Sequence, residues 1–417
     1  MKIALISVSD KTSLSTLASF LLDKDYNLLS TGGSYQYLKK HIPEDLHHRI
    51  KSIENFTGFP EILEGRVKTL HPKIYGGLLY DPTNSQHQAE FQHLNDSNHL
   101  PFNLEKIDMV VCNLYPFSQV VENPEHTDLE VIENIDIGGV SLLRAAAKNY
   151  KHVFPICNPY LYQKFIDNYQ YYITLDLFKK ELAKEAWEHV AKYDQCIASY
   201  FNPKVRYRKY TQVEKLKYGC NPYQNNAYLS TINEVDSPIE ILNGTPGYIN
   251  FLDAFHSWLL VSEATQSLGE ICSASFKHTA PAGVGLGKDL LSDIEKKMFM
   301  VGNIDTSNSE ASRAFLRARN CDPLSSFGDW VAVSGIVDLT CAQLLKREVS
   351  DGIIALGYSN DALEVLKSKK GGKFMILKGK SLSYQDIEFR EIFGMALSQS
   401  SNRELVTHKY LDKVVTE

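Results

Sequence analysis

The chain has 417 residues, of which 43% are hydrophobic and 23% charged, a balance typical of a soluble globular protein with about two to three domains. Its formal net charge of −6 argues against a protein that binds nucleic acid through bulk positive charge. The seven cysteines are odd in number and none form a CxxC pair, which indicates reduced thiols without a disulfide framework or a zinc knuckle. The N-terminal apolar run is too short for a signal peptide and no run is long enough to span a membrane, so we expect a cytosolic protein that binds neither metals, membranes nor nucleic acid.

The N-terminal region alternates between short apolar runs and helical patterns. Residues 2–8 are a short apolar run, which predicts a buried strand. Over residues 14–22 apolar side chains recur at i, i+3 and i+4, which predicts a helix with Ser9 or Asp10 as its N-cap. A second strand is predicted over 26–29, before another turn and helix. The repeated order of strand, polar turn and helix predicts a parallel α/β sheet.

Both turns in this pattern have the composition of a phosphate cradle. Each places hydroxyl groups at the start of a predicted helix, where free N–H groups and the helix dipole favour an anion. In parallel sheets, ligands bind beyond the carboxyl ends of the strands, where these turns are expected. Simple helix capping by the same hydroxyl groups is the alternative interpretation. The residues concerned are Ser7, Ser9, Lys11 and Thr12 in the first turn and Thr31, Gly32, Gly33 and Ser34 in the second.

A glycine-flanked basic segment follows over residues 65–77. It contains Arg66, Lys68 and Thr69 close together, with a histidine and a proline after them. The glycines permit tight bends or a close approach of the backbone to a ligand. This composition suits a loop that receives an anionic, planar small molecule, and a solvated basic loop is the alternative.

Two further segments bring polar residues to the same predicted edge. A strand over 109–114 ends close to Asn113 and Tyr115. Asp136 then precedes Gly138 and Gly139 at a predicted helix start. Asp136 either caps this helix or lies beside free glycine amides that form an oxyanion-binding nest.

The remaining pattern separates a helical region from a second domain. A strand is predicted over 153–156, and residues 161–200 are helical and rich in aromatic side chains. Asn202 and Pro203 open a basic linker. The predicted division is a sheet core over 1–150, a helical extension and linker over 151–210, and a second α/β domain over 211–417.

Five ordered blocks in the first half carry a resemblance to a known family. They read Ser-Val-Ser-Asp-Lys-Thr at 7–12, Ser-Thr-Gly-Gly at 30–33, Gly-Arg-Val-Lys-Thr-Leu-His-Pro at 65–72, Cys-Asn-Leu-Tyr-Pro-Phe at 112–117 and Ile-Asp-Ile-Gly-Gly-Val at 135–140. Together they resemble the PurH family of bifunctional purine-biosynthesis proteins, which join IMP cyclohydrolase to 5-aminoimidazole-4-carboxamide ribonucleotide (AICAR) transformylase. The resemblance implies an α/β protein, with a methylglyoxal-synthase-like parallel-sheet domain followed by a cytidine-deaminase-like domain, the first of the family's two transformylase units.

For the first domain, the resemblance implies closure of formyl-AICAR to IMP with loss of water and without a cofactor. Attack of the carboxamide nitrogen on the formyl carbon places negative charge on oxygen, which preorganised donors stabilise. We assign this stabilisation to Lys148 and the two glycine amides, deprotonation of the amide to Asp136, and orientation and proton movement to Lys68 and Tyr115. The residues implied for substrate binding are Ser9, Lys11, Ser34, Arg66, Thr69, Asn113, Gly138 and Gly139.

For the second domain, the resemblance implies formyl transfer from 10-formyltetrahydrofolate to AICAR. His278 is implied to take the proton from the attacking amine, and Lys277 to support the leaving folate. The zinc signature of true deaminases is missing from the sequence, which disfavours a metal-activated water. The positions implied for nucleotide binding are Tyr218, Asn250, Phe327, Gly328 and Asp351.

The second domain departs from the family pattern at several positions. Lys217 stands where the family has arginine, and lysine lacks the bidentate fork of a guanidinium. Tyr223 replaces a histidine, Leu356 replaces a proline, and the chain ends at Glu417, where the family continues into its second transformylase unit. We therefore expect a partial transformylase with little formyl transfer by this chain alone, and a homodimer that covers the apolar surface left exposed.

Two alternative functions are a methylglyoxal-synthase-like lyase acting on a triose phosphate and a non-catalytic nucleotide sensor. The ordered blocks at 65–72 and 112–117 argue against the lyase. The presence of four catalytic side chains together argues against the sensor, because binding alone does not require them.

Overall fold

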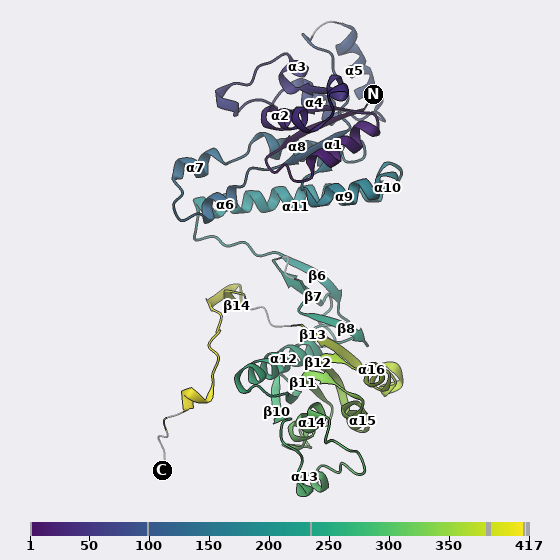
Figure 1. The fold of residues 1–417 in the computed structure, drawn as a ribbon, viewed down its shortest axis with the longest axis vertical. Coiled ribbons are helices and arrows are strands. Elements are labelled where there is room, and N and C mark those ends of the chain that lie inside the picture. Colours follow the sequence, from purple (N-terminus) through teal and green to yellow (C-terminus); the bar gives the residue numbers. More distant parts are fainter. Residues whose placement is uncertain (1, 98–99, 234–235, 381–384, 412, 414–417) are drawn as a thin grey trace. The chain divides into compact units, whose positions relative to one another are not determined.

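The computed structural model divides the chain into two compact units, Met1–Tyr207 and Arg208–Glu417 (Figure 1). The boundary falls inside the predicted basic linker. The residues that the structure describes are 2–97, 100–233, 236–380, 385–411 and 413. Glu417, at which the sequence ends, therefore lies outside the described residues, as do residues 412 and 414–416.

The first unit is built on a five-stranded parallel sheet. Its strand order is β3-β2-β1-β4-β5, so β1 is central and pairs with both β2 and β4. The parallel sheet and its first strand are as predicted. The strands are β1 (Lys2–Val8), β2 (Tyr26–Ser30), β3 (Ile50–Ser52), β4 (Met109–Asn113) and β5 (Phe154–Ile156).

Helices connect and cover these strands. The first helix buries Leu14, Leu17, Ala18, Leu21 and Leu22, which is the face that the apolar spacing predicted. The helices of the unit are α1 (Leu14–Asp23), α2 (Gly32–His41), α3 (Ile53–Thr57), α4 (Pro72–Leu79), α5 (Ser85–Asp96), α6 (Phe117–Glu122), α7 (Asp128–Glu133), α8 (Gly138–Lys148), α9 (Tyr160–Asp167), α10 (Tyr169–Thr174) and α11 (Asp176–Phe201).

The predicted N-cap of α1 is wrong. The helix begins after Ser13, which has a left-handed φ of 55° and makes no side-chain capping bond. The Asp10 carboxylate instead accepts a hydrogen bond from Thr12 N at 2.9 Å. The amides of Ser9 and Asp10 are already bonded to Asn113, so the chain turns once more before the helix starts.

The helical segment after residue 150 belongs to the first unit. Buried side chains of α9–α11, including Phe165, Tyr172 and Val190, lie in the same hydrophobic core as the strands. The long helix α11 packs against α8 and α6, and Figure 1 shows it running along the unit. The first unit is therefore larger than the predicted core of residues 1–150 by strand β5 and three helices.

The second unit contains a six-stranded mixed sheet with helices on both faces. Its order is β10-β9-β11-β12-β13-β8, with parallel pairing of β12 to β11 and β13. One face packs on α12 through Trp258 and Val261, and the other on α14–α16 through residues such as Phe315 and Leu345. The strands of this sheet are β8 (Ile239–Asn243), β9 (Cys272–Lys277), β10 (Ala280–Leu286), β11 (Asp329–Val337), β12 (Ser350–Tyr358) and β13 (Met375–Gly379). The helices of the unit are α12 (Tyr248–Leu268), α13 (Asp293–Met298), α14 (Glu310–Asn320), α15 (Leu339–Arg347) and α16 (Asn360–Lys367).

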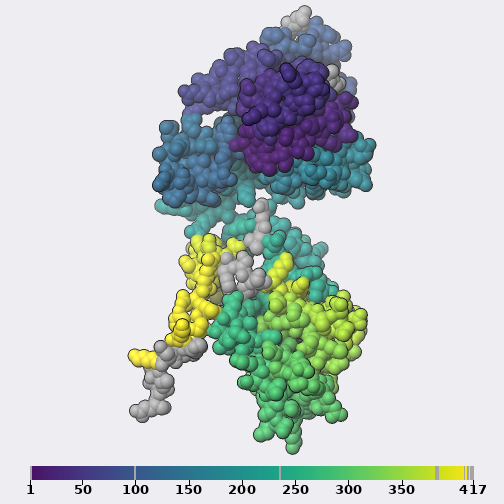
Figure 2. All heavy atoms as spheres, in the orientation of Figure 1, coloured from purple at the N-terminus to yellow at the C-terminus, as the bar shows by residue number. Residues whose placement is uncertain are grey.

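Two hairpins complete the second unit, β6 (Tyr210–Lys215) with β7 (Tyr228–Ile232), and β14 (Ile387–Ile392) with β15 (Met395–Ser400). The space-filling view in Figure 2 shows the segment from β14 onward, in yellow, at the surface of its unit. Across the described segments, no helix is both long and apolar enough to cross a membrane. All seven cysteines are free thiols.

Candidate active site

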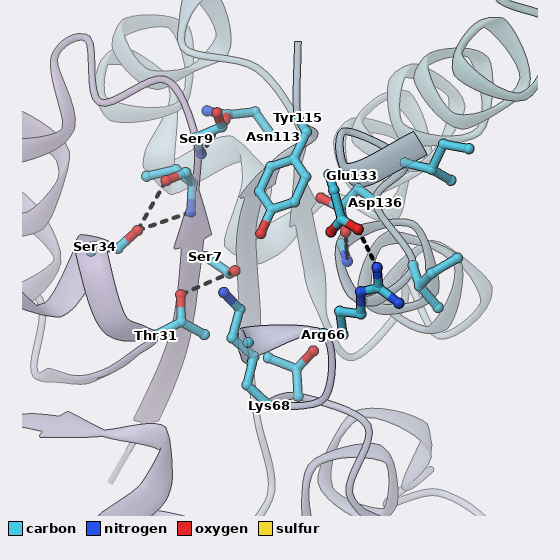
Figure 3. Close-up of a pocket in the computed structure, with 18 of the residues that line it drawn as sticks. Ser7, Ser9, Thr31, Ser34, Arg66, Lys68, Asn113, Tyr115, Glu133 and Asp136 are labelled. Carbon is cyan, nitrogen blue, oxygen red and sulfur yellow. Dashed lines mark hydrogen bonds and ion pairs between the residues drawn. The ribbon is translucent and has the colours of Figure 1, made fainter. Parts of the chain in front are cut away.

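A cavity of about 570 Å³ opens in the first unit at the carboxyl ends of β1 and β4. This is the edge at which the sequence placed the polar turns, since parallel strands present their carboxyl ends together. Figure 3 shows Lys68 and Tyr115 with their side chains directed into the cavity. The predicted residues that line it are Ser9, Lys11, Ser34, Arg66, Lys68, Thr69, Asn113, Tyr115, Asp136, Gly138 and Gly139.

Asp136 supplies a carboxyl group that a backbone amide orients. Its Oδ1 accepts a hydrogen bond from Gly139 N at 2.7 Å. Burial raises the pKa of Asp136, whereas the hydrogen bond from Gly139 N and the charge of Lys68 act in the opposite direction. A half-buried, oriented carboxyl with a raised pKa is suited to proton transfer.

The predicted nest of two free glycine amides is wrong for Gly139. Its N–H is bonded to Asp136, which thereby ties itself to the first turn of α8. Gly138 also has a steric role, because a Cβ at this position would lie 2.7 Å from Oγ1 of the buried Thr69. The glycine therefore allows the helix start to approach the basic loop.

Asn113 and Ser34 hold the first turn rather than leaving its amides free. Asn113 Oδ1 accepts from Ser9 N at 2.7 Å and Asp10 N at 2.8 Å, and its Nδ2 donates to Asp10 O at 2.8 Å. The Ser34 hydroxyl bonds both backbone polar groups of Val8 at 3.1 Å. The expectation that the backbone amides of this turn are free for an anion is therefore wrong for Val8, Ser9 and Asp10.

Arg66 lies at the rim of the cavity and pairs with Glu133 of α7. The side chains of the pair are 64% and 44% exposed, so both remain accessible to a ligand. The Glu133 carboxylate raises the pKa of Arg66. Sequence reasoning missed Glu133, because nothing local marks a residue that meets its partner 67 positions away.

Lys148 does not join the cavity. It is the last residue of α8, whereas Gly138 at the first residue lines the cavity. Ten residues of helix at 1.5 Å per residue separate the two positions by about 15 Å. Lys148 is exposed there, and Arg144, on nearly the same face, has its guanidinium 5.2 Å from the Trp187 ring.

In the second unit, Lys277 and His278 stand at the end of β9. The Lys277 ammonium donates to Phe327 O at 2.7 Å, which joins two of the predicted residues. His278 and Thr279 form the two-residue turn to β10 with φ of 53° and 67°. Left-handed backbone is costly for such residues, and strain of this kind concentrates at functional sites.

Asp253 of α12 supports this turn and was not found from the sequence. It is 7% exposed, and its Oδ1 accepts from Thr279 N at 2.6 Å. Burial raises the pKa of Asp253, while the Thr279 bond and the nearby His278 and His256 lower it. Asp253 therefore anchors the strained turn that carries His278.

The other predicted nucleotide positions lie on four separate segments of the second unit. Gly328, with a φ of 77°, donates to Val349 O at 2.8 Å, and Asp351 pairs with Lys370 at 2.8 Å. Asn250 Oδ1 accepts from Gly247 N at 2.9 Å at the start of α12. Tyr218 lies on the segment between β6 and β7.

A buried ionic network fixes the loop that carries Phe327. Arg319 pairs with Asp329 at 2.8 Å and Glu348 at 3.0 Å, and it donates to Ser326 O at 2.8 Å. Asp329, 1% exposed, also accepts from Ser275 Oγ at 2.6 Å. Within the described residues, no group of three or more His, Cys, Asp or Glu side chains is arranged to hold a metal ion.

Comparisons with known proteins assign the family. The model described as "AICARFT/IMPCHase bienzyme" matches residues 146–417, and the one described as "MGS-like domain" matches residues 13–141. The "Bifunctional purine biosynthesis protein PurH" of two Leptospira biflexa serovar Patoc strains is 33% identical over 432 aligned residues, which cover 100% of this chain and 75% of the relative. The chain belongs to the PurH family.

Membership of the PurH family makes the chain an enzyme of purine biosynthesis, of the kind that combines IMP cyclohydrolase and AICAR formyltransferase. The predicted family, fold class and function are confirmed, and the lyase and sensor alternatives are not favoured. In the PurH family, purine intermediates are the substrates and 10-formyltetrahydrofolate is the cosubstrate of the transformylase. A solved structure titled "Crystal structure of ForH" is 28% identical, with a TM-score of 0.40, covering 48% of this chain and 97% of that one.

Proposed function

We propose that the cavity of the first unit is the site where formyl-AICAR closes to IMP. The observation that carries the proposal is the meeting of Asp136, Lys68 and Tyr115 on one cavity between hydroxyl-rich turns. These groups supply a base, an ammonium and a phenol, which are the functions that the ring closure requires. A binding protein needs the turns and the basic rim but has no use for a half-buried carboxyl with a raised pKa.

The geometry supports a revised division of roles. The carboxamide nitrogen bonds to the formyl carbon, and Asp136 takes the proton from that nitrogen. Because Lys148 lies outside the cavity and Gly139 N is occupied, we assign the developing oxygen charge to Lys68 and Tyr115. Lys68 or Tyr115 protonates this oxygen to a hydroxyl group, and Asp136 returns the proton it took, so that the hydroxyl leaves as water. The nitrogen that carried the formyl group gives up its proton to the group that protonated the oxygen, and the C=N bond of IMP forms.

Nucleotide binding is assigned to the turns around β1 and β2. Ser9 and Lys11 line the cavity at the first turn, and Ser34, in the first turn of α2, lies beside them with its hydroxyl bonded to Val8. The positive end of the α2 dipole and the Lys11 ammonium favour the phosphate of the substrate in this region. Arg66 at the rim exchanges its Glu133 partner for an anionic group of the ligand.

The test is to add formyl-AICAR to the purified chain and to follow IMP by absorbance. We expect turnover by the parent chain and a loss of at least about a hundredfold in Lys68→Ala, since a single preorganised donor is worth roughly 10²–10³ in rate. Lys148→Ala is the matched lysine variant. We expect it to keep kcat within about threefold, and a loss equal to that of Lys68→Ala would overturn the revised roles.

We further propose that Lys277 and His278 serve formyl transfer from 10-formyltetrahydrofolate to AICAR in the second unit. Contact of Lys277 with Phe327 and the anchored His278 turn support this assignment. Incubation with AICAR and 10-formyltetrahydrofolate tests the expectation that the chain alone transfers little formyl group. Rapid product formation would refute that expectation, and loss of the rate in His278→Ala would then assign the base.

We also propose a homodimer that works in the cytosol. The β14–β15 hairpin presents Phe393, Met395 and Leu397 at 100%, 72% and 68% exposure, an apolar set that a second copy would cover. The seven free thiols suit a reducing compartment. Light scattering of the purified chain tests the dimer, and a strictly monomeric mass at micromolar concentration would contradict it.

A further inference from the structure

Helix α11 delivers a tyrosine hydroxyl to the backbone of the loop that carries Asp136. Tyr193 OH accepts a hydrogen bond from Asp136 N at 2.8 Å and donates one to Asn134 O at 2.8 Å. The residue is 8% exposed, and its ring packs edge-on against Phe117 with centroids 6.1 Å apart. One buried hydroxyl thus bonds the chain on both sides of Ile135.

This contact completes the set of bonds that orient Asp136. The loop between α7 and α8 spans only residues 134–137. On the carboxyl side Asp136 is held by Gly139 N, and on the backbone side by Tyr193. Burial raises the pKa of Tyr193 to about 12, so its hydroxyl stays protonated and able to donate at neutral pH.

We propose that Tyr193 is a positioning residue for the ring closure, because its hydroxyl fixes the backbone on either side of Ile135 and so the direction of the Asp136 carboxyl. The inference rests on the proposed role of Asp136 as the base. It gives α11 a part in the reaction although no residue of that helix lines the cavity.

The same helix provides a matched control. Tyr200 lies seven residues farther along α11, and its ring also packs edge-on against Phe117, with centroids 6.0 Å apart. Its hydroxyl donates to Asp128 of α7 instead of to the Asp136 loop. Phenylalanine at either position removes one hydroxyl and keeps the ring.

The experiment compares Tyr193→Phe and Tyr200→Phe in cyclisation of formyl-AICAR by the full chain. A displacement of about 1 Å at a reacting group costs about a hundredfold in rate, so we expect kcat of Tyr193→Phe to fall by about ten- to a hundredfold. The KM should stay within about threefold, because the nucleotide-binding turns are untouched. Tyr200→Phe should keep kcat within about twofold of the parent.

Two further readouts separate positioning from a general loss of structure. Amide hydrogen exchange should show lost protection at Asp136 in Tyr193→Phe and parental protection there in Tyr200→Phe. The acidic limb of the kcat profile should move to lower pH in Tyr193→Phe alone, because a less firmly held carboxyl gains solvent and its pKa returns toward the ordinary value. Protection of the β4 amides reports whether each variant is folded.

The outcomes distinguish this inference from the proposed function. Parental kcat in Tyr193→Phe overturns the inference alone, and so does parental protection of the Asp136 amide. An equal loss of kcat in both variants also overturns it, because the effect would then belong to α11 packing. A parent chain that forms no IMP overturns the proposed function and this inference with it.

Discussion

Replacing Asp136 by asparagine separates the charge of this side chain from its shape. The Oδ1 of asparagine still accepts the hydrogen bond from Gly139 N, which the carboxylate accepts at 2.7 Å in the parent. The amide has no basic oxygen comparable with a carboxylate. The variant therefore keeps the loop in place and removes the group that takes the proton.

The size of the effect follows from this separation. A positioned general base contributes about 10²–10⁴-fold, which corresponds to about 3–5 kcal/mol of activation free energy. We expect kcat of Asp136→Asn to fall by that factor. The KM for formyl-AICAR should change by less than about threefold, because the residues of the nucleotide-binding turns are unchanged.

The pH dependence has a definite sign. Burial raises the folded-state pKa of Asp136 above its ordinary value of 3.8, and the reaction uses the carboxylate. Activity of the parent should therefore fall as the pH falls through this raised pKa, and Asp136→Asn should lack that acidic limb. The folded state binds this proton more tightly than the unfolded chain, so stability is lost as the pH rises through the folded pKa. At neutral pH the asparagine variant should be at least as stable as the parent.

The assay is absorbance-detected formation of IMP from pH 4 to 9, with thermal unfolding of the same samples. Asp23→Asn, an exposed carboxyl on α1, is the control and should match the parent in both measurements. The assignment would be refuted if Asp136→Asn kept kcat within about tenfold or retained the acidic limb.

Three other variants test the packing around the two candidate sites. Arg319→Met leaves the buried Asp329 without its cation and should lower the free energy of unfolding of the second unit by about 3–5 kcal/mol in denaturant titrations, and an unchanged midpoint would contradict this. Asn113→Ala removes three bonds to the first turn and should raise the KM for formyl-AICAR about tenfold, with the reasoning refuted if KM stays parental. Gly139→Ala places a Cβ 2.5 Å from Asp136 Oδ2 and should lower kcat at least about tenfold, whereas parental kcat would show that the carboxylate can move without cost.

The sequence predicted the framework of the first unit well because its signals are local. Apolar periodicity over 14–22 depends only on neighbouring residues, and α1 buries the face that this spacing indicated. The polar turns follow buried strands, so a parallel sheet brings them to one edge whatever the details of packing. This is why the residues expected for cyclisation, except Lys148, line one cavity.

The missed features depend on contacts between distant residues. Asn113 accepts hydrogen bonds from the amides of Ser9 and Asp10, which lie 104 and 103 positions away in the sequence. Tyr193 accepts a hydrogen bond from the amide of Asp136, 57 positions away. Hydrogen bonds between distant residues do not change the local pattern of apolar and polar residues. The sequence therefore predicts neither the occupied amides of the first turn nor the late start of α1. Lys148 is the exception because its expected role came from the family resemblance, whereas the eleven-residue α8 places it at the far end of the helix from the cavity.

The shared core of the first unit has a practical consequence for anyone who wishes to excise the cyclohydrolase as a separate enzyme. A fragment that stops at residue 150 would leave bare the apolar surface on which Phe165, Tyr172 and Val190 pack, and we expect it to precipitate on expression. A cut between Asn202 and Tyr207 leaves that surface covered and severs only exposed chain. The domain boundary to use in dissecting or fusing this enzyme is therefore the end of α11 and not the last strand of the sheet.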